Sequence, residues 1–138
     1  MTSTRDETGS AVLESVLLAP VLILMFAAVV GGARVTLAHQ RVDSAAAQAA
    51  RAASTAASPG TATTVARTTA QAALSSGGQD CTRMTVSVDV GNFQPGGSVT
   101  VRVACIANLG SGVPGLSGQR TITGSGSEVI DTFWQVGG

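Results

Sequence analysis

Residues 15–33 read SVLLAPVLILMFAAVVGGA, and this uncharged stretch decides the fold. Counting back to Ala11 lengthens the apolar run across a single acidic residue, Glu14. A helix needs roughly 20 apolar residues to cross the hydrocarbon core of a bilayer. Pro20 predicts a modest kink near residues 16–20, which membrane helices tolerate better than soluble ones. The sequence therefore predicts a transmembrane helix, assigned to residues 10–33.

The composition limits what the rest of the 138-residue chain can do. Charged residues make up 12%, against about 25% in ordinary soluble domains. The eight basic residues are all Arg and are balanced by eight acidic ones. Aromatic residues make up 3%, which excludes a large aromatic core. Because sparse, balanced charge creates little field for phosphate binding, no nucleic-acid partner is expected.

Two other interpretations of the apolar run compete with a membrane span. A secretory signal peptide cut near Ala33 would have a net positive region before the run, whereas here Arg5 is offset by Asp6 and Glu7. A buried helix of a soluble protein needs more surrounding core than the chain provides. The membrane anchor is therefore the preferred interpretation.

Glu14 is the informative residue of this segment. A carboxylate at the edge of the hydrocarbon is costly unless it is paired or lifted into the interface. One interpretation places Glu14 at headgroup depth, where the helix dipole favours an anion. The other asks for a cation, and a new α-amine at Ser10, made by cutting after Gly9, would supply one.

Residues 9–14, GSAVLE, have the form of a type III signal sequence. In type IV prepilins the leader ends in a glycine and a glutamate is fifth in the mature chain, which would be Gly9 and Glu14 here. With Pro20 six residues beyond the glutamate, the segment resembles the TadE/TadG-like family of Tad pilus-assembly proteins. The resemblance implies a leader over residues 1–9, cleavage between Gly9 and Ser10 by a prepilin peptidase, and assembly through Glu14.

The resemblance extends along most of the chain. The Ala/Arg-rich stretch from Arg41 resembles the helix that follows the span in this family, and the tail resembles high-GC Gram-positive members. Ser10 replaces the phenylalanine of major pilins, and Ser15 replaces a residue that is often aromatic, so a minor pilin or pseudopilin is favoured. The implied partners are other pilin subunits, Tad inner-membrane assembly proteins and a prepilin peptidase, with no cofactor and no small-molecule substrate.

The remainder of the chain predicts a small α+β fold. Alanine-rich helices are expected from Arg34 to Ala57, ended by Ser58-Pro59-Gly60, and from Thr61 to Leu74. Alternating valines then predict a hairpin, with Val86 and Val101 on its buried face. A third strand is expected over 120–126, with room to continue to Ile130. The predicted divisions are a leader (1–9), a span (10–33), a helical stalk (34–76) and a β head (77–138).

Cys81 and Cys105 flank this hairpin and predict a disulfide, with two buried free thiols as the alternative. In an antiparallel hairpin, the numbers of two directly opposite residues add to a constant. If the valines of the two strands share one face, that constant is odd, whereas 81 and 105 add to an even number, so Cys81 cannot lie directly opposite Cys105. A bulge or bend near Cys81 would bring the two sulfurs together.

The membrane orientation is open to two interpretations. The positive-inside rule counts Arg34, Arg41 and Arg51 after the span and favours a cytoplasmic head. The disulfide and the pilin resemblance favour an extracytoplasmic head, which is the prediction adopted.

Residues for catalysis or metal binding are sparse. His39 is the single histidine and is expected on a helix surface, and without Lys no Ser-x-x-Lys pair exists. Gly110–Gly115 matches GxGxxG but lacks a following helix signal, since Pro114 lies where a helix would begin. Neither an enzymatic activity nor a metal site is expected. The alternative function is an uncleaved single-pass membrane protein that acts as an envelope scaffold or adaptor.

Overall fold

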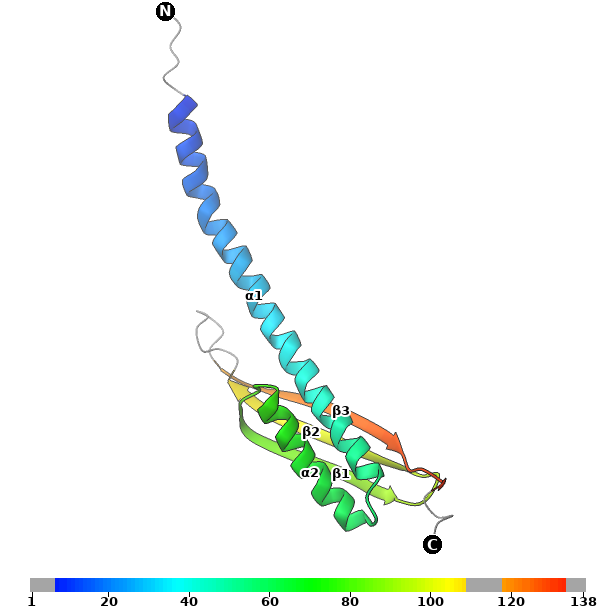
Figure 1. The fold of residues 1–138 in the computed structure, drawn as a ribbon. Helices are drawn as coiled ribbons and strands as arrows, with labels where there is room; N and C mark the ends of the chain where they lie inside the picture. Colours follow the sequence, from blue (N-terminus) through cyan, green and yellow to red (C-terminus); the bar gives the residue numbers. More distant parts are fainter. Residues whose placement is uncertain (1–6, 109–117, 134–138) are drawn as a thin grey trace, which may run out of the picture. The chain divides into compact units, whose positions relative to one another are not determined.

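The computed structural model describes residues 7–108 and 118–133, which form two helices followed by three strands (Figure 1). The elements are α1 (Glu7–Ser54), α2 (Pro59–Ser76), β1 (Cys81–Asn92), β2 (Ser98–Asn108) and β3 (Gln119–Val129). This order confirms the predicted α+β class. The chain divides into two compact units, residues up to Arg34 and residues from Val35 onward.

Helix α1 ends earlier than the sequence predicted. The Ser-Pro-Gly sequence at 58–60 was expected to end the first helix, but α1 already ends at Ser54. Ser58 is instead the N-cap of α2, with an extended backbone and a hydroxyl that accepts from the Thr61 N–H at 3.2 Å. Pro59 follows in the first turn, where a missing N–H removes no helical hydrogen bond. The same three residues therefore start α2, which begins two residues before its predicted start.

The sheet is antiparallel in the order β1-β2-β3, which leaves β1 and β3 as its edges within the described ranges. Val86 pairs with Val103 and Val88 pairs with Val101, so the two valine faces coincide as predicted. The third strand is longer than the minimum expected, and it runs the full length of β2.

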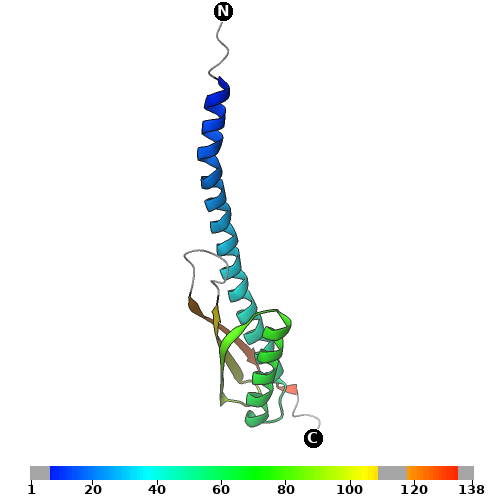
Figure 2. The same ribbon diagram turned by 90° about the vertical axis from the view of Figure 1, so that its left-hand side faces the viewer.

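The core lies between one face of the sheet and two helices. In two views, α2 and the part of α1 from Val35 onward lie on the same face of the sheet (Figures 1 and 2). Residues buried there come from all these elements and are mostly alanine and valine, for example Val42, Ala49, Ala66, Val101 and Val103. Because these side chains are short, helices and sheet approach each other closely.

Two glycines allow the closest of these approaches. Gly124 and Gly126 pair with Val103 and Val101 of β2 and lie on the helix-facing side of β3. A Cβ on Gly126 would lie 2.6 Å from the Ala46 carbonyl oxygen, and one on Gly124 would lie 2.8 Å from the Asp43 nitrogen. Real Cβ atoms do not come this close, so α1 packs directly on the backbone of β3.

Cys81 and Cys105 form a disulfide, with their Cα atoms 5.4 Å apart. Met84, rather than Cys81, pairs with Cys105, and Cys81 pairs with Ala107. The register shifts between Cys81 and Arg83. The predicted disulfide is confirmed, and the irregularity next to Cys81 is the one that the odd pairing sum required.

Candidate functional site in helix α1

The first compact unit exposes an unusual amount of apolar surface. Twelve of its large hydrophobic side chains are between 50% and 72% exposed: Val12, Leu13, Val16, Leu17, Leu18, Val21, Leu22, Ile23, Leu24, Met25, Phe26 and Val29. Helix α1 is long and apolar enough to cross a bilayer. Exposed leucines, isoleucine and phenylalanine on all sides of a helix are typical of a surface that faces lipid, not water. This segment is therefore the candidate membrane anchor.

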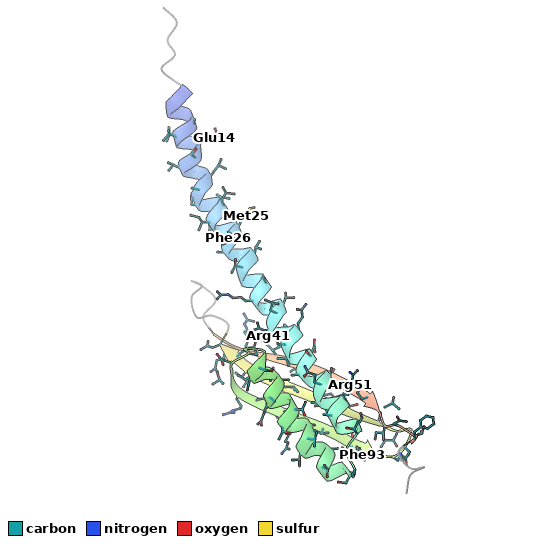
Figure 3. All side chains as sticks on the ribbon, viewed as in Figure 1. Glu14, Met25, Phe26, Arg41, Arg51 and Phe93 are labelled. Carbon is teal, nitrogen blue, oxygen red and sulfur yellow. A yellow bond between two sulfur atoms is a disulfide. The ribbon has the colours of Figure 1, made fainter. Side chains whose placement is uncertain are left out.

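Glu14 is the acidic residue within this apolar surface. It is exposed, and it lies in the same helix as Met25 and Phe26, whose side chains project outward with it (Figure 3). Among the described residues, no cation lies within ion-pair distance of Glu14. The next residue, Ser15, donates its hydroxyl to the Ala11 carbonyl oxygen at 2.9 Å. The serine is therefore satisfied within the helix, whereas Glu14 forms no ion pair among the residues that the structure describes.

Pro20 lies inside α1, and the helix continues through it. Proline has no N–H to donate to the carbonyl four residues earlier, at Val16. In a membrane such a carbonyl needs a neighbouring group to bond it. The kink over 16–20 remains a prediction.

Gly9 and Ser10, the predicted cleavage site, lie in the first turns of α1. A Cβ placed on Gly9 would meet nothing within 4 Å. Packing therefore gives no reason for a glycine here, although glycine costs about 1 kcal/mol relative to alanine in a helix.

The other residues considered from the sequence lie apart from this segment. His39 is exposed on α1, beyond the apolar run. The described residues bring together no group of three or more His, Cys, Asp or Glu side chains. Residues 110–115, which carry the GxGxxG pattern, lie outside the described ranges.

Sequence reasoning missed two features that depend on strand register. One is the close packing of Gly124 and Gly126 against α1, for which isolated glycines in a strand are the available sequence signal. The other is the placement of Arg41, Arg83 and Arg120, which lie at one end of the second unit. No local sequence signal could have revealed that placement, because it depends on which strand ends lie together.

The exposed apolar run over residues 11–33, with Glu14 as its one carboxylate, is a candidate membrane anchor that precedes a small α+β unit. Residues 9–51 match the family model described as TadE-like protein. The resemblance inferred from the sequence is confirmed over this segment, which begins at Gly9 and covers less than half of the chain. The match supports a Tad pilus-associated protein. No curated protein and no solved structure matches the chain.

Proposed function

We propose that this chain is a TadE-like minor pilin or pseudopilin that takes part in assembly of a Tad pilus at the cell envelope. A prepilin peptidase cuts after Gly9, residues 10–33 remain in the membrane, and the disulfide-bonded unit lies on the extracytoplasmic side. The partners are other pilin subunits and the inner-membrane proteins of the Tad system.

One observation carries the proposal: Glu14 is the one charged residue of the exposed apolar run over 11–33, five residues after Gly9, in a segment that matches the TadE-like family. A charge in lipid is costly unless an opposite charge meets it. The α-amine created at Ser10 of a neighbouring subunit would meet this carboxylate. Such a pair fixes the axial position of one helix against the next.

N-terminal sequencing of the protein isolated from its native membrane tests the cleavage. The proposal expects the mature chain to begin at Ser10. A start at Met1 or Thr2 would leave an uncleaved membrane scaffold or adaptor, the alternative function. A start at Arg34 would identify a secreted protein whose apolar segment is a signal peptide.

Gly9→Ala separates recognition from folding. Because a Cβ at this position has free space, the variant should insert and fold like the natural chain. The proposal expects it to keep its full length in cells, since the peptidase reads the glycine. Normal processing of Gly9→Ala would contradict the assigned cleavage site.

Glu14→Gln tests the assembly role. The variant should insert in the membrane as before, because removing a charge lowers the cost of insertion. Its co-purification with the pilin subunits should fall, since the Ser10 amine loses its partner. Glu128→Gln, the same chemical change in the second unit, is the matched control. Equal co-purification of the two variants would contradict the role of Glu14.

A further inference from the structure

The charged side chains of the second unit are sorted along its strands. Arg83 of β1 and Arg120 of β3 lie at one end of the sheet. At this end Ala107 of β2 pairs with Cys81 and with Arg120, and Arg83 pairs with the preceding residue of β2, Ile106. The rows at the other end hold Asp89 and Glu128, and Asp131 follows β3. Arg120 and Glu128 are eight residues apart, or about 26 Å along the strand.

Helix α1 adds to the basic end. It runs in the same direction as β3, because Gly124 lies against Val42, Gly126 against Ala46, and Glu128 at 3.8 Å from Arg51. The start of this helical stretch therefore lies beside the start of β3.

Arg41 and the last turn of α2 complete that end. Arg41 lies next to Gly77, since a Cβ on that glycine would be 3.9 Å from the Arg41 Cγ. Leu37 lines the same hollow as Arg41 and Gly77 and is 48% exposed, and Val35, two residues earlier on α1, is 38% exposed. This end therefore presents apolar side chains beside arginines.

The two ends differ in charge. The basic end, defined by Arg41, Arg83 and Arg120, has one acidic neighbour, Asp80, which precedes β1. Asp43 lies farther along, beside Gly124. Among the described residues no acidic group forms an ion pair with any of the three arginines. The acidic end carries Asp89, Glu128 and Asp131, with Arg51 in an ion pair with Glu128 and Arg102 two residues from the partner of Asp89.

We propose that the basic end is a docking surface for the phosphate headgroups of anionic lipids. This end is the one that the chain joins to the apolar anchor, since Arg41 is seven residues after Arg34, the last residue of the first unit. Val35 and Leu37 beside arginines suit the boundary between headgroups and acyl chains. A second copy of the chain is the competing occupant, since its acidic end has the complementary charge. Charged groups at that end would not cover the exposed apolar side chains of the basic end, whereas lipid would.

The full chain, reconstituted as one copy per lipid nanodisc, provides the test. Trp134→Phe removes the native tryptophan, and Gln119→Trp places a reporter at the basic end, with Asn92→Trp as the reporter at the acidic end. A lipid carrying a nitroxide on its headgroup quenches tryptophan on contact. The measurement compares phosphatidylglycerol with phosphatidylcholine discs, at low and high salt.

The expected result is strong quenching of the Gln119→Trp reporter in the anionic discs alone, relieved by salt because exposed charges are screened. Arg83→Gln with Arg120→Gln should lower the ratio of docked to undocked molecules roughly 30-fold. Arg67→Gln with Arg102→Gln, two exposed arginines elsewhere on the same unit, is the matched control and should keep the quenching. The Asn92→Trp reporter should not be quenched.

Equal quenching in the two lipids, or equal loss in the two double variants, would overturn the proposal. Contact that appears only with two copies per disc, and that disappears in Asp89→Asn with Asp131→Asn, would assign this end to a second copy instead. Because the docking needs the anchor but not the cleavage after Gly9, a failed cleavage test leaves this inference standing.

Discussion

Gly124 and Gly126 are important because they have no Cβ atom. In sequence they interrupt a Thr- and Ser-rich strand and suggest a weak one. In the structure they provide the space in which the backbone of α1 meets the backbone of β3. The sequence predicted the strand from its flanking residues, but not this role, because the helix that contacts the glycines lies far away along the chain.

Gly126→Ala should destabilise the second unit by about 1–3 kcal/mol, the usual cost of forcing extra atoms into a packed core. The added methyl would overlap the Ala46 carbonyl unless α1 moves. Ser125→Ala, the neighbouring position on the exposed face of β3, is the control and should change stability by less than about 0.5 kcal/mol. Thermal unfolding measures both, and equal melting temperatures would contradict the close packing.

In helix α1 the spacing of apolar residues predicted only part of the buried surface. Apolar residues recur every three or four positions from Val35 to Ala56, a spacing that predicts one narrow apolar face. Ala38, Val42, Ala45 and Ala49 of this face are buried, and Ala52 and Ala56 are half-buried. Ala46, Ala50 and Ala53 are buried as well, because α1 contacts both the sheet and α2 and so buries a wider stripe. Val35, predicted on that face, is partly exposed. Alanine fits either a buried or an exposed position, so the alanine pattern alone could not predict that α1 packs against α2 as well as against the sheet.

The N-cap of α2 provides a test at the same scale. Ser58→Ala removes the hydroxyl that accepts from the Thr61 N–H and should lower stability by about 1 kcal/mol. Ser75→Ala, exposed in the last turn of α2, should have little effect. Chemical denaturation of the two variants under the same conditions compares them, and a neutral Ser58→Ala would show that the cap is dispensable.

The disulfide joins β1 to β2 across a loop with a sequence separation of 24. Closing a loop of this size stabilises a fold by about 3 kcal/mol, so Cys81→Ala with Cys105→Ala should lose about that much. Alkylation of the native chain without reductant should add no mass, and reduction should expose both thiols. Two labels on the unreduced chain would contradict the bond.

At the scale of the whole molecule, the apolar helix could be predicted from the sequence more completely than the packing of the second unit. The anchor and Glu14 are local features, because length, hydropathy and spacing are all read within about thirty residues. Strand register and the positions of the charged side chains depend on pairing between distant segments. The sequence limited the register only by requiring the valines of the two strands to share one face. Together with the two cysteines, this requirement predicted an irregularity near Cys81.

The exposed apolar segment predicts how the full chain behaves in cells. Leu22→Lys places a charge within the run, which costs about 2.5–3.5 kcal/mol on insertion scales. We expect a larger fraction of this variant to be extracted from membranes by alkaline carbonate. Gln48→Lys, exposed beyond the run, should stay in the membrane fraction. Equal extraction of the two variants would argue against a lipid-spanning segment.

The predominance of alanine in the core has a further consequence for sequence change. Ten of the clustered buried residues are alanine, which has one methyl to lose, so truncating substitutions can remove little. Enlarging substitutions have nowhere to place new atoms. A saturation screen of this interior should therefore reverse the familiar profile of globular proteins: glycine in the helices should cost about 1 kcal/mol, whereas leucine, methionine and phenylalanine should be rejected at nearly every position.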